Sequence, residues 1–308
     1  MKQKLMSEQR PMWTPEFEAF VAPARRKPQI WRLLVGGLII AFCWAVGTFG
    51  TFALGGLVGV LNGLDPQEME RDLLAGNSPF GTLLVLVTFT GLFLGVILAG
   101  KVHSRSVQSL FGDRQAWPFV LGFGAIAAVS LLSLVFPTEL EIVPNLATRT
   151  FLTLLPFTIF FLLIQTGAEE LLFRGYLQTQ LAARFRSPIV WMFLPGLLFG
   201  ALHYAPSEFG PNAIYVVAAI TLVGWLTADL TRVTGGIGAA WGLHFANNAG
   251  GIILVGSPGP LGGLALYRQT TQPDDPVLAP LLAVQIGFLI VAWLLCRLWI
   301  AKSQRAVA

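Results

Sequence analysis

Long apolar segments are the feature that most limits how this 308-residue chain can fold. A helix needs about 20 predominantly apolar residues to cross the hydrocarbon core of a bilayer. Charged residues make up only 12% of the chain, about half the share typical of a soluble domain. We therefore predict an all-α, multi-pass membrane protein, a bundle of about eight transmembrane helices. The predicted spans are Trp31–Leu61, Thr82–Gly100, Trp117–Phe136, a long one from about Phe151 past Arg174, Ile189–Tyr204, Ala213–Leu230, Gly236–Val255 and Pro280–Ile300.

Basic residues are distributed unevenly between alternate loops. Of the 20 Lys and Arg residues, 17 lie in the N-terminal leader, in alternate loops and at the C-terminal end, counting Arg174 with the loop before Ile189. The intervening loops carry only Arg71, Arg149 and Arg268. Those loops also hold nine acids: Asp65, Glu68, Glu70, Asp72, Glu139, Glu141, Glu208, Asp274 and Asp275. Because Lys and Arg concentrate in cytoplasmic loops, we predict a bacterial cell-membrane protein with both termini cytoplasmic. The net charge of +4 reflects this topology, and we predict no nucleic-acid partner.

The predicted organisation is one membrane domain in four segments. A basic cytoplasmic leader (1–30) is followed by N-terminal transmembrane helices (31–149), a catalytic transmembrane core (150–255), and an outer loop with a C-terminal transmembrane helix (256–308). Trp13, Phe17 and Phe20 leave two alternatives for the leader, a helix on the membrane surface or a disordered tail. Gly236, Gly238 and Gly242 form a small-residue face that favours close packing of another helix.

Ionisable and amide side chains inside the apolar spans are the candidates for function. Charge is costly in hydrocarbon, so an intramembrane ionisable residue usually has a functional role. These residues are Glu169, Glu170 and Arg174 on the fourth span, His203 on the fifth, and His244 and Asn248 on the seventh. The third histidine, His103, lies in a basic loop, and we interpret it as an ordinary surface residue.

Helical spacing distinguishes the two carboxylates. Glu170 and Arg174 are four residues apart and share one helix face, which predicts an ion pair. Glu169 is rotated about 100° from Glu170, which leaves it available for chemistry. His244 and Asn248 are also four residues apart, so both can reach one cavity, whereas Asn247 points elsewhere.

These side chains can form one site only if they lie at the same depth in the membrane. At 1.5 Å per residue, Glu169 lies roughly 22 Å from Arg184, His203 roughly 21 Å from Ile189, and His244 roughly 18 Å from Arg232. The three depths agree to within about one turn only if Arg184 and Arg186 mark the membrane boundary. We therefore predict that Arg174 is buried with Glu170.

A carboxylate, two imidazoles and an amide inside a membrane suit peptide hydrolysis. A carboxylate or imidazole can take a proton from water, while a second imidazole and an amide can stabilise an oxyanion. Alternatively, Glu169, His203 and His244 could bind Zn²⁺, with water as the fourth ligand. The residues leave both alternatives open.

The order and spacing of these motifs resemble those of the CPBP family of intramembrane proteases. The resemblance rests on Glu169-Glu170-x-x-x-Arg174, Phe199-x-x-x-His203 and His244-x-x-x-Asn248, and it covers about residues 150–255. This family includes the type II CAAX prenyl endopeptidases and the Abi bacteriocin-processing and immunity proteins. The resemblance implies that Glu169 and His203 activate water, that His244 and Asn248 stabilise the oxyanion, and that Glu170 and Arg174 support the site. Members have been described both as metalloproteases and as metal-independent glutamate proteases, so a divalent metal such as Zn²⁺ or no cofactor remain alternatives.

We therefore predict an intramembrane endopeptidase whose substrate is a membrane-associated protein or peptide. Two other classes compete with this prediction. One is a non-catalytic bacteriocin-immunity or scaffolding protein. The other is an ion-coupled transporter, which would favour inverted repeats and broken helices; the sequence shows neither feature.

Overall fold

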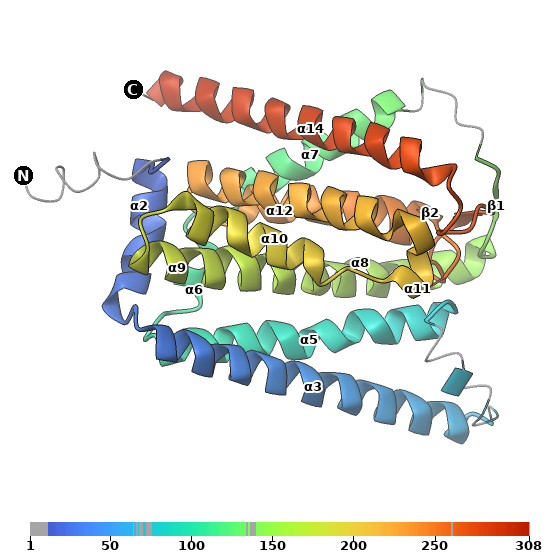
Figure 1. Cartoon of the computed structure of the whole chain (residues 1–308). Coiled ribbons are helices and arrows are strands. Elements are labelled where there is room, and N and C mark those ends of the chain that lie inside the picture. Colours follow the sequence, from blue (N-terminus) through green and yellow to red (C-terminus); the bar gives the residue numbers. More distant parts are fainter. Residues whose placement is uncertain are drawn as a thin grey trace, which may run out of the picture.

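The computed structural model describes residues 12–63, 65, 67, 70–71, 76–133, 135, 140–259 and 261–307. The start of the basic leader, including Lys2, Lys4 and Arg10, lies outside these residues, as do Glu68, Asp72 and Glu139 of the acidic loops. The chain folds as a bundle of long helices (Figure 1). The principal helices are α3 (Ile30–Leu61), α5 (Pro79–Val102), α7 (Ala116–Ser133), α8 (Thr148–Glu170), α10 (Leu194–Ala201), α12 (Ala213–Thr234), α13 (Gly238–Ala249) and α14 (Leu278–Val307).

The apolar surface of these helices confirms a multi-pass membrane protein. Leu38, Phe42 and Phe49 on α3 are 71%, 70% and 76% exposed. Such a face cannot remain in water but is stable against lipid. Five helical segments of the described chain are long and apolar enough to cross a bilayer: Ile30–Leu61, Pro79–Val102, Thr148–Arg184, Pro206–Thr234 and Leu278–Gln304.

The other three predicted spans are shorter than expected. The described part of the third, Ala116–Leu132, and the fifth, Ile189–Ala201, are apolar helices of fewer than 18 residues. The seventh consists of α13 followed by a short π-helix, η5 (Gly250–Leu254).

The helices lie side by side across the bundle, with α7 out of chain order. The α3–α5 hairpin forms one edge, α8, α10 and α12 lie in the middle, and α14 lies at the opposite edge beside α7 (Figure 1). Glycines allow the closest approaches. A Cβ on Gly224 of α12 would lie 2.8 Å from Cα of Gly196 on α10. The predicted small-residue face of α13 contacts α7, where a Cβ on Gly242 would overlap the carbonyl oxygen of Phe119. The prediction of close packing at these glycines is confirmed.

The loops that the charge pattern grouped together do meet at common ends of the bundle. At one end, Thr14 Oγ1 donates to the carbonyl of Arg232 at 2.6 Å, and Gln304 Nε2 donates to Glu16 at 3.1 Å. At the other end, Asn145 Nδ2 donates to the carbonyl of Ala265 at 2.8 Å. We refer to these as the basic end and the acidic end.

A small β-sheet at the acidic end is absent from our sequence prediction. Its strands are β1 (Ile142–Pro144), β2 (Val255–Gly256) and β3 (Tyr267–Gln269), in the order β1-β3-β2. Strand β1 pairs antiparallel with β3, and β2 pairs parallel with it. Strands of two or three residues carry too little alternation to be distinguished from loops.

The described part of the leader packs on the protein, and both alternatives predicted for it are wrong there. Helix α2 (Pro15–Val21) begins at an N-cap, where Thr14 Oγ1 accepts from the backbone N–H of Phe17 at 3.1 Å. A 3₁₀-helix, η1 (Ala22–Arg26), follows it. The ring centroids of Phe17 and Trp191 are 4.9 Å apart, and Phe17 and Phe20 are buried. The leader is therefore part of the core at the basic end.

The interpretation of His103 as a surface residue is wrong, because its side chain is buried. Its Nδ1 lies 2.7 Å from the carbonyl oxygen of Lys27, and its Nε2 lies 3.0 Å from the hydroxyl of Tyr176. Burial and the nearby charge of Arg105 lower the pKa of His103, against the opposing effect of the Lys27 hydrogen bond. Burial also lowers the pKa of Arg105 to about 10. The preceding helix carries His103 into a contact with a distant part of the chain, which local sequence does not reveal.

Candidate active site

The two carboxylates lie at the end of α8, immediately before a π-helix. Glu169 is 8% exposed and Glu170 is fully buried. The π-helix η2 (Leu171–Gln178) begins at the next residue and leads into α9 (Thr179–Arg184). Single π-turns within α-helices occur frequently at functional sites.

Arg174 is buried beside Glu170, as helical spacing and membrane depth predict. Its Nη1 lies 3.1 Å from Glu170 Oε1, and its exposed fraction is 1%. The guanidinium carbon lies 4.8 Å from the ring centroid of Phe199, and Nη2 donates to the carbonyl of Gly224 at 3.3 Å. One guanidinium thus connects η2 to α10 and α12. A buried arginine of this kind requires its carboxylate partner, because an unpaired charge is strongly disfavoured in a protein interior.

Helix α13 places His244 against both carboxylates. Trp241, one turn earlier, donates its indole N–H to Thr166 Oγ1 at 3.1 Å and lies over Gly167 of α8. His244 Nδ1 lies 2.8 Å from Glu170 Oε1, and Nε2 lies 3.4 Å from Glu169 Oε2. An ion-paired carboxylate can only accept hydrogen bonds, so Nδ1 of His244 carries a proton and donates it to Glu170. Nε2 is then the nitrogen that faces Glu169.

Asn248 completes this group from the next turn of α13. Its Nδ2 lies 3.2 Å from His244 Nε2 and donates to Gln165 Oε1 at 3.3 Å. Gln165 was missed in the sequence analysis. The available signal was its position four residues before Glu169 in an apolar span, which places both side chains on one face of α8. Asn247 contacts Asn248 Oδ1 at 3.3 Å and makes no other described side-chain hydrogen bond.

His203 lies just after α10, on the side of Phe199 that faces a cavity. Its Nδ1 lies 2.8 Å from the carbonyl oxygen of Phe199. A carbonyl only accepts, so Nδ1 carries the proton and Nε2 is the free basic nitrogen. The Phe199 ring lies 5.1 Å from the His203 ring and 5.8 Å from the His244 ring, between centroids. Glu169 interacts electrostatically with both imidazoles. The structure therefore brings together all six residues singled out in the sequence.

A cavity of about 370 Å³ opens beside His203 toward the acidic end. Its walls come from α11 (Pro206–Phe209), α12, η5 and the loop after β2, and they are mainly apolar. Ile220, Ile252 and Leu261 contribute apolar side chains. This volume is within the range of ligand-binding pockets, so a segment of substrate can reach His203 from this end.

The predicted zinc ligands do not form a metal site. Across the described residues, no group of three His, Cys, Asp or Glu side chains is placed to hold a metal ion. Glu169, His203 and His244 form no such group, although Nε2 of each histidine is free of the hydrogen bonds that its Nδ1 makes.

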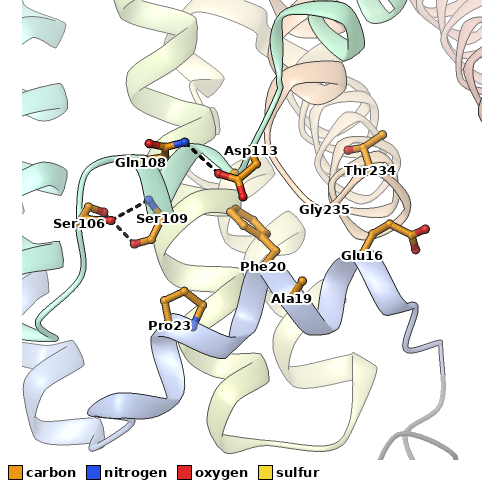
Figure 2. Close-up of a pocket in the computed structure, with 11 residues that line it drawn as sticks. Glu16, Ala19, Phe20, Pro23, Ser106, Gln108, Ser109, Asp113, Thr234 and Gly235 are labelled. Atoms are coloured by element: carbon orange, nitrogen blue, oxygen red, sulfur yellow. Dashed lines mark hydrogen bonds between the residues drawn. The ribbon is translucent and has the colours of Figure 1, made fainter.

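A second depression, of about 530 Å³, lies at the basic end (Figure 2). It lies between α2, the loop that contains α6 (Gln108–Phe111), and the turn after α12. Gln108 Nε2 donates to Asp113 at 2.9 Å on its wall. None of the predicted site residues lines it. Its volume exceeds that of the cavity at His203, but it lacks the site's chemistry.

Comparison with known proteins supports the predicted family. Residues 151–250 match the family described as type II CAAX prenyl endopeptidase Rce1-like. This segment is Rce1-like. The match covers all three motifs, from the helix that bears Glu169 to the turn after Asn248, and so confirms the resemblance to the CPBP family. Uncharacterized protein YyaK of Bacillus subtilis strain 168 is 25% identical over 238 residues, which cover 75% of this chain and 79% of that protein. No solved structure matches the chain.

Proposed function

We propose that this chain is an intramembrane endopeptidase that hydrolyses a peptide bond of a membrane-associated protein or peptide. The observation that carries the proposal is the contact of His244 with both Glu169 and Glu170, next to a cavity that His203 lines. Glu170 is held by Arg174 and His244, which leaves Glu169 as the carboxylate free to exchange a proton. The Rce1-like segment contains all of these residues and supports a peptidase.

The proposed reaction begins with a water between Glu169 and the free Nε2 of His203. Glu169 takes one proton from this water while Nε2 of His203 orients it, and the oxygen attacks the carbonyl carbon of the scissile bond. Glu169 passes this proton to Nε2 of His244, which lies 3.4 Å from its Oε2. The negative charge on the carbonyl oxygen is then stabilised by hydrogen bonds from Asn248 Nδ2 and from Nε2–H of His244. The Glu170 carboxylate stabilises the resulting imidazolium. The C–N bond breaks, and the leaving amine receives the proton, which His244 returns through Glu169.

We further propose that the reaction needs no metal ion, because the described residues include no group of three ligands placed to hold one. Activity should persist after exhaustive dialysis against a chelator. Elemental analysis of the purified protein would contradict this part of the proposal if it found zinc in stoichiometric amount and activity that followed the zinc content.

We propose eight membrane-crossing segments in the cell membrane, with the basic end cytoplasmic and no nucleic-acid partner. The support is the concentration of Lys and Arg at the end where α2 and the end of α14 meet (Figure 1). The variants Glu16→Cys and Asp274→Cys, treated in intact cells with a membrane-impermeant thiol reagent, test the orientation. Only the cysteine at position 274 should be labelled.

The catalytic proposal is tested with the protein in nanodiscs and a mixture of synthetic peptides with apolar stretches, with cleaved bonds identified by mass spectrometry. Glu169→Gln and His203→Gln should each lower the cleavage rate about 10²- to 10⁴-fold, the usual contribution of a general base. Glu141→Gln is the matched control, since Glu141 is an exposed acid at the acidic end of the bundle, outside the site. Cleavage at the parental rate by both site variants would refute the mechanism. An immunity or scaffolding role would instead be favoured if the double variant Glu169→Gln/His203→Gln still complemented loss of the parent protein in cells.

A further inference from the structure

The cavity beside His203 has a carboxylate in its wall in addition to its apolar side chains. Glu208 lines the cavity together with His203, and these two are its only ionisable side chains among the described residues. Glu208 was assigned from the sequence only to an acidic loop. Its position in the wall of the proposed substrate cavity allows its carboxylate to contact a bound substrate.

The fold holds Glu208 in this position. Its backbone N–H donates to the carbonyl of Ala205 at 3.1 Å within the short helix α11. Gly210, at φ 47°, then turns the chain, and this left-handed conformation favours glycine. Asn212 Nδ2 donates to the carbonyl oxygens of Pro273 and Asp275 at 3.0 and 2.8 Å. These hydrogen bonds tie the α11 region to the loop that forms the opposite wall.

The carboxylate of Glu208 is available to a ligand. It is partly buried, and no described residue forms a hydrogen bond or ion pair with it. Glu208 Oε1 lies close to Gly259, where a built Cβ would be 3.7 Å away. Because Gly259 has no side chain, it leaves the carboxylate uncovered on that side. A carboxylate beside apolar walls is poorly hydrated, and a cation of the ligand would restore its lost interactions.

Charge near the cavity favours the same ligand. Asp274 lies next to Gly210, and a Cβ on that glycine would approach its Cβ to 2.9 Å. Glu141 and Asp275 lie at the same end of the bundle. The described acids at this end outnumber its arginines, Arg71, Arg149 and Arg268. A concentration of like charges attracts ligands of opposite sign and repels ligands of the same sign.

We propose that Glu208 is a specificity-determining residue that binds the ammonium or guanidinium group of a Lys or Arg in the substrate. The inference rests on the proposed peptidase function and names its substrate class. The ligand is an extended peptide whose apolar side chains contact Ile220, Ile252 and Leu261 and whose basic side chain reaches Glu208. A carboxylate at that substrate position, including a free C-terminus, is disfavoured by repulsion from Glu208.

Binding and cleavage are measured separately, so that this inference and the proposed function can fail independently. Fluorescein-labelled apolar peptides that differ at one position, with Lys, norleucine or Glu, are titrated by fluorescence anisotropy. The protein is the full chain in phosphatidylcholine nanodiscs, as the parent, Glu208→Gln, Glu208→Lys and Glu141→Gln. Glu141 again serves as the control, because it is an acid at the same end that does not line the cavity.

The parent should bind the Lys peptide about tenfold more tightly than the norleucine peptide, as expected for one hydrogen-bonded charge pair. This ratio should fall to near one in Glu208→Gln, and Glu208→Lys should prefer the Glu peptide. The Glu141→Gln control should keep the parental ratio. An unchanged ratio in Glu208→Gln, or no preference in the parent, would overturn the inference whether or not any peptide is cleaved. A Lys preference without cleavage would leave the Glu208 site standing and count against the peptidase.

Discussion

Replacing Arg174 by methionine tests whether the buried ion pair supports the site. Methionine keeps the length and apolar volume of the arginine stem but removes its charge. Glu170 would then remain fully buried with His244 as its only described partner, since its Oε2 already has none. The link from η2 to the carbonyl of Gly224 on α12 would be lost as well.

The expected loss is at the lower end of the range for breaking a buried pair. Removing one partner of such a pair costs about 3–5 kcal/mol. The contact with His244 persists in the variant, so we expect about 3 kcal/mol. The double variant Glu170→Gln/Arg174→Met leaves no charge buried at this pair, and the amide oxygen introduced by Glu170→Gln can still accept from His244 Nδ1. It should recover all but about 1 kcal/mol of this loss, because removing both charges leaves neither one buried without its partner.

Unfolding can be followed in mixed micelles by titrating SDS against dodecylmaltoside. Cys296 is fully buried, whereas Cys43 is partly exposed; with Cys43→Ala in every variant, reaction of Cys296 with a thiol-specific fluorophore reports loss of the native bundle. Arg149→Met is the matched control, because Arg149 is an exposed arginine in the first turn of α8, the helix that leads into η2. Stability of Arg174→Met within about 0.5 kcal/mol of the parent, the usual range for a surface substitution, would refute the reasoning, as would a double variant less stable than Arg174→Met.

Two further predictions use the same unfolding measurement. Gly122→Ala should destabilise the protein by about 1–3 kcal/mol, because its Cβ would overlap the carbonyl oxygen of Ala239 on α13. Gly124→Ala on the same helix meets no atom within 4 Å and should be neutral or stabilising by up to about 1 kcal/mol; equal effects of the two would contradict the α7–α13 contact. His103 has a lowered pKa in the fold, so the unfolded chain takes up its proton first. Stability should therefore be full above pH 6.5, the reference value, and fall below it, and His103→Gln should flatten this decline. An unchanged pH profile in the variant would show that other groups cause the decline.

The local contacts of the site could be predicted from the sequence. The Glu170–Arg174 ion pair and the His244–Asn248 contact each join residues four positions apart, and helix geometry alone brings such residues together. The burial of Arg174 followed from counting residues to the membrane boundary. These predictions required only regular helices of known rise and pitch.

Contacts between distant segments could not be predicted in the same way. His244 bridges two carboxylates because Trp241 positions α13 against α8, and nothing in the local sequence specifies that orientation. The same is true of His103, which meets Tyr176 from a distant helix.

The apolar segments and their interrupting charges alone determined that this chain is a multi-pass membrane protein with one polar site in its C-terminal half. That information is local, because the cost of placing charge in hydrocarbon acts on each residue separately. Tertiary structure decided that His244 contacts both carboxylates and that Glu208 lines the cavity beside His203. Those outcomes depend on how whole helices pack, and helix packing is a property of many side chains acting together.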